Sequence, residues 1–562
     1  MDPGFVSPAR AGIDWGLLPR GSRMRGTMMD LPLTVSLLAE RPARYFRDVE
    51  VVSRQPDRAL HRTTWGPVIE RARALAGALL RAGLRRGDRV ATLMWNHAQH
   101  LETYFAAPLA GGVVHTLNLR LSPDDLAFIA THAQDRFLVV DDVLLPLLDK
   151  FRARAPFEQI IVVRHTPREL PAGCAEYESF LRSAEGCFDA PELSESDASG
   201  LCYTSGTTAR PKGVVYTHRS TVLHTFFLTM PDGMGLSQSD TVLPVVPMFH
   251  VNAWGLPYGC ALAGAKLVFP GPHLDAESLL DLLERERVTL GAGVPTIWMG
   301  ILEALEKNPG RWKLQPGLRM VVGGSAAPEA LIRGFDKHGL RLVHAWGMTE
   351  MSPLGSIGFL KEKMRELPYD EQVRIRAKQG VPSSLVQVRA VDDSGREAPW
   401  DGKTQGELQV RGPWVASAYT DMKGCEDRWT QDGWLKTGDV VTIDPEGYLS
   451  LTDRTKDLIK SGGEWISSVA LENALMGHPA VKEAAVIAIP HPKWSERPLA
   501  AVVLREGMRV TAEELRDFLA SRVHSYWVPD AFDFIDAIPR TSTGKFLKSA
   551  LRERYRSYQL PP

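Results

Sequence analysis

The chain has 562 residues, of which 44% are apolar and 24% charged, so a soluble enzyme with several domains and a large core is expected. Its 66 basic residues are balanced by 67 acidic ones, which argues against a protein that holds nucleic acid by bulk charge. No apolar run is long enough to span a bilayer, which leaves only peripheral membrane contact open.

Residues 1–27 are rich in glycine, proline and arginine and lack the continuous apolar segment of a secretory signal. Because residues 16–22 faintly resemble a protease-site scar from an expression vector, we predict a disordered or tag-like leader over 1–27. The five cysteines, at positions 174, 187, 202, 260 and 425, show no paired spacing. This fits a reducing cytoplasm, where we expect the protein, and argues against a zinc cluster.

Helix and strand patterns alternate over the first third of the chain. The apolar periodicity predicts helices at 31–47, 65–82, 97–111, 122–133 and 144–153, a strand pair within 49–64, and strands at 89–94, 113–116, 136–140 and 160–163. Residues 167–199 are polar and read as a connecting stretch. The alternation then resumes, with helices at 218–229 and 276–286 and strands at 241–246, 265–269, 290–294, 320–322 and 340–345. Such alternation indicates a layered α/β unit with mostly parallel strands.

The predicted secondary structure changes after residue 382, where the helix patterns stop. Short β runs at 385–391, 406–411 and 448–452 predict a small β-rich unit. From about residue 454 the pattern predicts helices at 469–476 and 512–522 and strands at 483–489, 499–504 and 530–535. We therefore predict an α/β protein. A large N-terminal domain over 28–453 would combine several α/β subdomains with the β unit, and a small mobile α+β domain would follow over 454–562.

Residues 203–213 read Tyr-Thr-Ser-Gly-Thr-Thr-Ala-Arg-Pro-Lys-Gly. Glycine lets backbone N–H groups approach an anion, hydroxyls donate hydrogen bonds, and lysine adds a full charge. The spacing differs from the P-loop, which ends in Gly-Lys-Ser/Thr and opens a helix. Here apolar runs on both sides predict flanking strands instead. We predict a phosphate-binding loop between two strands, with a polar surface turn as the alternative.

Five motifs in chain order resemble those of the adenylate-forming superfamily, which includes acyl-CoA synthetases, luciferases and peptide-synthetase adenylation domains. They are the loop at 204–213, Trp-Gly-Met-Thr-Glu at 346–350, Thr-Gly-Asp at 437–439, Asp-Arg-Thr-Lys-Asp at 453–457 and Pro-Arg-Thr-Ser-Thr-Gly-Lys at 539–545. The resemblance covers nearly the whole chain after the leader. Segments 246–254 and 457–467 are most similar to medium- and long-chain fatty acyl-CoA synthetases.

The resemblance implies a reaction in two steps. The carboxylate of a medium- to long-chain fatty acid attacks the α-phosphate of ATP, giving acyl-AMP and pyrophosphate, and the thiol of CoA then displaces AMP. It also implies Mg²⁺ bound with ATP and a homodimer. The residues it assigns to ATP and AMP are Thr204, Ser205, Gly206, Thr207, Thr208, Lys212, Gly323, Gly324, Ser325, His344, Ala345, Trp346, Gly347, Met348, Thr349, Asp439, Arg454 and Lys545.

Each residue type suits the role that the resemblance gives it. Thr349 donates to the α-phosphate, and Glu350, with Thr208, is an oxygen ligand for Mg²⁺. Trp346 offers an aromatic face to adenine, and Asp439 and Arg454 hydrogen-bond the ribose. Each of these has a plainer alternative: an indole in the core for Trp346, or a turn cap for Asp439.

Lys545 is the residue we expect to catalyse the first step, because two anions must meet and a cation between them stabilises the transition state. By resemblance, Lys456 is the hinge about which the small domain rotates, although an ordinary solvated charge is the alternative. The segment that then approaches CoA is Ser461, Gly462, Gly463 and Glu464.

His250, Val251 and Trp254 follow a predicted strand at the position of the superfamily's acyl pocket. His250 is expected near the substrate carboxylate, with a catalytic role, and Trp254 as a gate of the fatty tunnel. The alternatives are a core histidine with satisfied hydrogen bonds and a plain pocket wall.

One position departs from the superfamily pattern, since Ala209 stands where its phosphate loops have glycine. If that position needs a positive φ, alanine costs roughly 1 kcal/mol, and we hypothesise that activity survives because the hydroxyls and Lys212 remain. Two other functions stay open: a ligase for short or sulfur-containing acids such as 3-methylthiopropionate, and a non-catalytic protein that keeps the fold.

Overall fold

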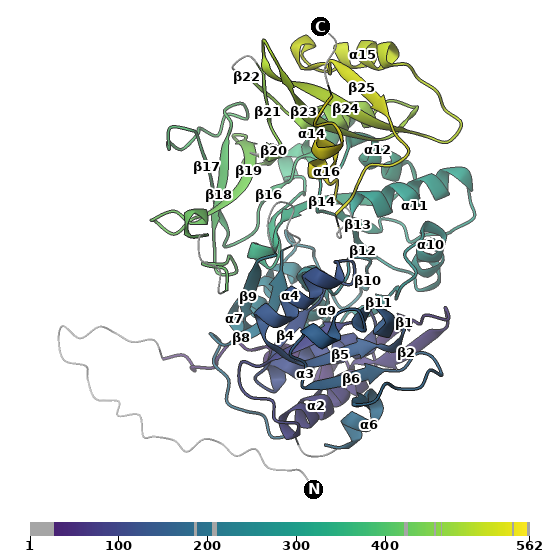
Figure 1. Ribbon diagram of the computed structural model, residues 1–562, viewed down its shortest axis with the longest axis vertical. Helices are drawn as coiled ribbons and strands as arrows, with labels where there is room; N and C mark the ends of the chain where they lie inside the picture. Colours follow the sequence, from purple (N-terminus) through teal and green to yellow (C-terminus); the bar gives the residue numbers. More distant parts are fainter. Residues whose placement is uncertain are drawn as a thin grey trace, which may run out of the picture. The chain divides into compact units, whose positions relative to one another are not determined.

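The computed structural model describes residues 27–184, 188–204, 211–420, 425–454, 457–461, 464–541 and 545–558, with the side chain of Glu464 excepted. The chain divides into two compact units, Met1–Pro32 and Leu33–Pro562, and the second holds every described helix and strand (Figure 1). The predicted leader lies outside the described residues apart from Thr27. Among the described residues, no helix is both long and apolar enough to cross a membrane.

The first sheet comprises β3 (Arg89–Leu93), β4 (Val113–Thr116), β5 (Asp135–Asp141), β6 (Gln159–Val163), β7 (Cys174–Glu176), β8 (Ala198–Tyr203) and β9 (Gly213–Thr217). In the described part of the chain they lie in the order β7-β6-β5-β3-β4-β8-β9, and each pair is parallel except β8 and β9 (Figure 1). β3 to β6 are almost fully buried, which explains their unbroken apolar runs. The carboxyl ends of β3, β5 and β6 therefore meet at one edge.

Helices and turns connect these strands. They are α2 (Trp65–Arg81), α3 (Ala98–Leu109), α4 (Pro123–Ala133), η1 (Asp142–Leu144), α5 (Leu145–Leu148), η2 (Arg152–Arg154), α6 (Tyr177–Arg182) and α7 (His218–Thr229). Local chemistry fixes where two of them begin. Ser122 caps α4 by accepting the N–H of Asp125 at 3.1 Å, and Thr217 and Ser220 cap α7 reciprocally.

The second sheet, counted over the described residues, has nine strands in the order β16-β15-β14-β13-β12-β10-β11-β1-β2. Its members are β1 (Glu50–Arg54), β2 (Leu60–Thr64), β10 (Thr241–Pro244), β11 (Lys266–Phe269), β12 (Leu290–Gly293), β13 (Arg319–Val322), β14 (Arg341–Gly347), β15 (Leu354–Ile357) and β16 (Val381–Pro382). Within this sheet, neighbouring strands run parallel from β14 through β13, β12, β10 and β11 to β1. The helices and helical turns of this region are α1 (Val35–Tyr45), α8 (Val251–Trp254), α9 (Leu256–Ala263), α10 (Ala276–Arg285), α11 (Pro295–Lys307), α12 (Glu329–Lys337), η3 (Thr349–Met351), η4 (Glu362–Met364) and α13 (Tyr369–Ala377).

The β-rich unit is an antiparallel sheet of β17 (Gln387–Val391), β18 (Gly406–Arg411), β19 (Leu435–Ile443) and β20 (Leu449–Arg454), with η5 (Glu426–Arg428). The small C-terminal domain consists of β21 (Ile459–Ser461), β22 (Glu464–Ile466), α14 (Ser468–Met476), β23 (Val481–His491), β24 (Ser495–Leu504), α15 (Ala512–Ala520), η6 (Ser525–Trp527), β25 (Ala531–Phe534) and α16 (Lys548–Arg554). Apolar residues on the two faces of its sheet form two separate cores.

The predicted fold class is confirmed, and the errors are local. Of the predicted helix at 144–153, only α5 over 145–148 is α-helical, with a 3-10 turn before it and another after it. The chain turns there and buries Phe151. The stretch at 167–199 contains β7 and α6, which are too short to leave a periodic signal. β19 was missed as a strand because Gly438, at φ +75°, interrupts its apolar alternation.

Candidate active site

The predicted phosphate loop lies between the antiparallel strands β8 and β9, as the sequence indicated. Its base is closed by two hydrogen bonds: the Thr204 N–H donates to the Lys212 carbonyl at 2.9 Å, and the Lys212 N–H donates to Thr204 Oγ1 at 3.1 Å. Five predicted positions of the loop, Ser205, Gly206, Thr207, Thr208 and Ala209, lie outside the described residues. The structure therefore fixes the two ends of the loop.

Tyr419 links Lys212 to Glu350, the carboxylate predicted to hold Mg²⁺. Its Nζ is 4.8 Å from the centre of the Tyr419 ring, and the Tyr419 hydroxyl donates to Glu350 Oε1. Burial and the Glu350 carboxylate raise the pKa of Tyr419, so its hydroxyl stays a donor. The backbone carbonyl of Thr349 accepts the Tyr216 hydroxyl at 2.7 Å, which ties this segment to β9. A cation, a hydroxyl and a carboxylate thus meet at the end of the loop.

Tyr419 is a site residue that the sequence reasoning missed. It stands in an irregular Ala-Ser-Ala-Tyr-Thr segment, and its position depends on distant contacts. The Thr420 N–H donates to the Gly213 carbonyl at 3.0 Å, and the Ala416 N–H donates to the Glu350 carbonyl at 2.7 Å.

Trp346 and Asp439 come from two different sheets and contact each other directly. The indole Nε1 donates to Asp439 Oδ2 at 2.9 Å, while Arg454 Nε lies 3.2 Å from Asp439 Oδ1. Asp439 and Arg454 are paired across β19 and β20, and the carboxylate raises the pKa of Arg454. A buried carboxylate held at both oxygens presents a fixed acceptor, so the predicted adenine and ribose residues form one unit.

Glycine is required beside Trp346. A Cβ on Gly347 would lie 2.0 Å from the Pro353 carbonyl oxygen, and one on Gly355 would lie 2.3 Å from the Trp346 ring. The indole therefore has Gly355 against it, and the chain can fold back from β14 to β15. His344 is buried, its Nδ1–H donates to the Ala377 carbonyl at 3.0 Å, and burial lowers its pKa.

A cavity of about 210 Å³, named the nucleotide cavity below, is lined by residues of both domains that were predicted to bind the nucleotide. Its walls include most of the residues predicted to bind ATP and AMP from β13 onward, namely Gly324, Ser325, His344, Ala345, Trp346, Gly347, Asp439, Arg454 and Lys545. Gly323, Met348, Thr349, Lys212 and Glu350 are not among its walls. The C-terminal domain adds Glu472, Asn473, Arg540 and Lys548, which the sequence reasoning did not single out.

Lys545 reaches this cavity from the C-terminal domain. Its N–H donates to Thr541 Oγ1 at 3.1 Å, and its carbonyl accepts the Thr541 N–H at 2.7 Å. Its Cε lies 3.6 Å from the place a Cβ on Gly324 would occupy, and Gly324 has φ +89°. The positive φ favours glycine there, whereas a Cβ would meet the lysine only at ordinary van der Waals distance.

His250 lies near the same lysine. Burial, with the charges of Lys545 and Arg120, lowers the pKa of His250 to about 3. The imidazole is therefore neutral at physiological pH and acts as a hydrogen-bonding group. Its expected place near the substrate carboxylate stays a prediction.

The segment after His250 is a left-handed turn. Val251, Asn252, Ala253 and Trp254 have φ between 45° and 58°, and Gly255 follows at 75°. Such φ values are costly for residues with a Cβ, above all for β-branched valine. The turn directs Trp254 onto Gly323, where a Cβ would lie 3.0 Å from the indole. Trp254 therefore contacts Gly323, whose neighbour Gly324 lines the cavity described above.

The predicted hinge and CoA segment are only partly described. Lys456, Gly462 and Gly463 lie outside the described residues, and of Glu464 only the backbone in β22 is described. Ser461 is buried inside the C-terminal domain, with its Oγ 2.8 Å from the Tyr526 hydroxyl.

The chain next to the hinge is tied to the following helix. Asp453 Oδ2 accepts the Ser468 N–H at 2.7 Å and also the Ser468 hydroxyl. The end of β20 therefore caps the first helix of the small domain.

Comparison with known proteins points to one family over most of the chain. The model of the AMP-binding enzyme family matches residues 38–420, and that of the AMP-binding enzyme C-terminal domain matches residues 470–545. The long-chain-fatty-acid–CoA ligase of Thermus thermophilus is 49% identical over 543 residues, covering 96% of this chain and 99% of that protein. The 3-methylmercaptopropionyl-CoA ligase of Ruegeria lacuscaerulensis is 47% identical over 543 residues, covering 95% and 99%.

A solved structure agrees with these sequence matches. The crystal structure of an anthranilate CoA ligase in complex with anthranoyl-AMP superposes with a TM-score of 0.84 at 26% identity, covering 94% of this chain and 98% of that one.

Proposed function

Because this chain belongs to the AMP-binding enzyme family, and within it to the ATP-dependent acyl-CoA ligases, we propose that it converts a medium- to long-chain fatty acid to acyl-AMP and then to acyl-CoA, releasing pyrophosphate and AMP. The observation that carries the proposal is the shared cavity, in which Trp346, Asp439 and Lys545 converge from three separate parts of the sequence.

The nucleoside of ATP would lie against the unit formed by Trp346, Asp439 and Arg454. The indole supplies an aromatic face for adenine, and Asp439 accepts hydrogen bonds from the ribose hydroxyls. Since Trp346 and Arg454 already hold the carboxylate, less conformational freedom is lost when the ribose binds. His344, Ala345 and Gly347 would complete the adenine wall.

The phosphates would lie between the loop at 204–213 and Glu350. Lys212 brings a positive charge close to Tyr419, whose hydroxyl donates to Glu350, and the loop hydroxyls would add donors. The carboxylate of Glu350 is buried, and its oxygen donor suits Mg²⁺, so the residues fit the ion, with Thr208 as a further ligand. When bound, Mg²⁺ would neutralise charge on the departing pyrophosphate.

Lys545 would act where the fatty carboxylate meets the α-phosphate. Its ammonium group stabilises the negative charge shared by the two reactants, and Thr349 donates to the α-phosphate. His250 is neutral, so it orients the carboxylate without bringing a second positive charge. The left-handed turn over Val251 and the indole of Trp254 would border the acyl chain.

We assign the second step to the small domain over 454–562, moving relative to residues 28–453. In this proposal Lys456 is the hinge, and the segment from Ser461 to Glu464 reaches CoA after Lys545 withdraws. The cap that Asp453 forms on α14 is the contact nearest the hinge, and it would restrict which rotations are accessible. We further propose a cytoplasmic homodimer.

A ligase for 3-methylthiopropionate or other short acids is the second candidate. It is favoured by the relative from Ruegeria lacuscaerulensis, which is almost as similar as the fatty-acid ligase. An ATP–pyrophosphate exchange assay across acids of graded length separates the two. We expect exchange to peak at medium or long chains. A sharp peak at short acids would favour the second candidate, and no exchange with any acid would refute ligase activity altogether.

A further inference from the structure

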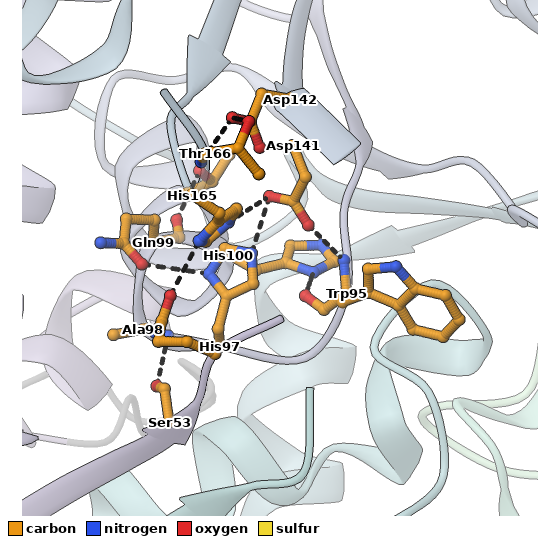
Figure 2. Close-up of polar contacts among 12 residues, drawn as sticks. Ser53, Trp95, His97, Ala98, Gln99, His100, Asp141, Asp142, His165 and Thr166 are labelled. Atoms are coloured by element: carbon orange, nitrogen blue, oxygen red, sulfur yellow. Dashed lines mark hydrogen bonds and ion pairs between the residues drawn. The ribbon is translucent and has the colours of Figure 1, made fainter. Parts of the chain in front are cut away.

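Two histidines and one aspartate meet outside the nucleotide cavity, at the carboxyl edge of the first sheet. His97 lies between β3 and α3, Asp141 ends β5, and His165 follows β6. They are 44 and 24 residues apart in sequence, and the parallel order of the three strands brings them together. Figure 2 shows the Asp141 carboxylate reaching both imidazole rings. Ligand sites are common at this edge of a parallel sheet.

The three side chains are buried and directed at one point. His97 Nε2 lies 2.8 Å and His165 Nε2 3.2 Å from the same oxygen, Asp141 Oδ1. One ligand atom from each residue lies within 4.8 Å of the other two, and the side chains are 1–4% exposed. Zinc bonds of about 2.0–2.1 Å in tetrahedral geometry place neighbouring ligand atoms about 3.3 Å apart. The two contacts to Asp141 Oδ1 would change by about 0.1–0.5 Å to reach this spacing, and a pair of ligand atoms at the 4.8 Å limit would close by about 1.5 Å.

A second layer of contacts fixes each of these ligands. His97 Nδ1 lies 3.1 Å from Gln99 Oε1 (Figure 2), and His165 Nδ1 lies 2.8 Å from Gln55 Oε1. With Nδ1–H donating to an amide oxygen, each ring turns the lone pair of Nε2 toward the carboxylate. Metal-binding histidines are held in this way. With both rings in this tautomer, three electron-pair donors face one another and repel unless a metal ion or a proton lies between them.

We propose that His97, Asp141 and His165 bind one divalent late first-row metal ion, with Zn²⁺ as the best match. Two imidazoles and a carboxylate are typical zinc ligands, whereas Mg²⁺ and Ca²⁺ prefer oxygen alone. The hollow that they border, with Arg54 and Pro272 among its other walls, has no volume for a substrate, so the ion is structural.

The surrounding charge is compatible with a cation. Arg54, the positive group at the hollow, donates to the Ser278 carbonyl at 2.6 Å. Asp142, next to Asp141, adds a second carboxylate that is 1% exposed, and its Oδ1 has no hydrogen-bond partner among the described residues. The site uses no cysteine, so the unpaired cysteine spacing carries no information about it.

The site supports the turn that leads to His250. Asp141 Oδ2 accepts the Trp95 N–H at 2.9 Å, and the Trp95 ring meets that of Phe249 edge-on at 6.2 Å. The next residue, Asn96, donates to the carbonyls of Pro244 and Val246, each at 3.0 Å, and accepts the Met248 N–H at 2.7 Å. A bound ion would therefore stiffen the segment at 95–97 on which the acyl-site turn rests.

The test uses the full chain purified without a metal-affinity step. We expect elemental analysis to find about one equivalent of zinc, and after chelator treatment we expect one equivalent of added Zn²⁺ to bind in calorimetry and to raise the melting temperature. His165→Ala should weaken this binding at least 100-fold, whereas His338→Ala, which removes an exposed histidine, should leave it unchanged. Should His165→Ala fail to fold, Co²⁺ added to the native chain should give the visible absorption of a tetrahedral nitrogen–oxygen site.

The proposal is overturned if the native chain binds no stoichiometric zinc and neither chelator nor added metal changes its melting temperature. In that case hydrogen bonds from the two histidines to Asp141 hold the three side chains together without a metal. Equal zinc binding by His165→Ala and the native chain would also overturn it, since the metal would lie elsewhere. Stoichiometry and melting temperature are independent of ligase activity, so either result stands whatever the acyl substrate proves to be.

Discussion

Replacing Trp254 by alanine should change the preferred acyl chain length. The indole is 7% exposed and lies against Gly323, directly behind the nucleotide cavity. Removing a buried indole costs roughly 3–5 kcal/mol of stability, because its contacts are lost and a cavity remains. A longer acyl chain can fill that cavity. Each buried methylene contributes about 0.8 kcal/mol, so four additional methylenes recover about 3 kcal/mol, roughly a 200-fold change in relative kcat/KM.

Pyrophosphate release measured with a series of saturated acids reports this change. The kcat/KM profile of Trp254→Ala should move toward longer chains by about four carbons. Trp298→Ala is the matched control, because that indole is fully buried and donates to the Val321 carbonyl without lining the cavity. It should lose stability and keep the native profile. If folded Trp254→Ala keeps the native profile as well, Trp254 is part of the core and the assignment of the acyl pocket is wrong.

Three further outcomes follow from the site. Lys545→Ala should slow acyl-AMP formation about 100- to 1000-fold while sparing thioester formation from supplied acyl-AMP, and equal loss of both half-reactions would contradict its role. Trp346→Phe keeps an aromatic face but removes the donor to Asp439. Hydrogen bonds to charged groups contribute about 1.5–3 kcal/mol, so we expect roughly tenfold weaker ATP binding in calorimetry, and unchanged affinity would refute this. Burial lowers the pKa of His224 to about 3 and that of His218 to about 4, from 6.5. As the pH falls below 6.5, these histidines take up protons in the unfolded chain but not in the folded one, so the free energy of unfolding decreases. Urea unfolding should show about 2 kcal/mol lost per histidine between pH 7 and pH 5, and His224→Asn should flatten that slope; a pH-independent stability would exclude this linkage.

Sequence patterns predicted the parallel sheets well because a strand buried on both faces leaves an unbroken apolar run. The residues of the nucleotide cavity could be named because short motifs mark the turns at which those strands end. Asp439 was named through such a motif even though β19, which carries it, was not recognised. Motif order therefore succeeded where periodicity failed.

Residues placed by long-range contacts could not be predicted. Tyr419 contacts Glu350 across 69 residues, from a segment with no pattern of its own. The pairing of His97 with His165 depends on the order of β3, β5 and β6, which the sequence does not state. The left-handed turn after His250 was also unforeseen, since its residues other than Asn252 and Gly255 are types that avoid positive φ.

The antiparallel pairing of β8 and β9 has an electrostatic consequence for ATP binding. In a P-loop, the phosphates lie at the start of a helix, whose backbone dipole attracts them at short range. Here the chain returns as β9 instead, and α7 begins only after Thr217. If the proposed function holds, charged side chains such as that of Lys212 would counter the charge of the triphosphate in place of a helix dipole. Attraction of that kind is screened over about 10 Å at 0.1 M salt, so the affinity for ATP would depend on the ionic strength.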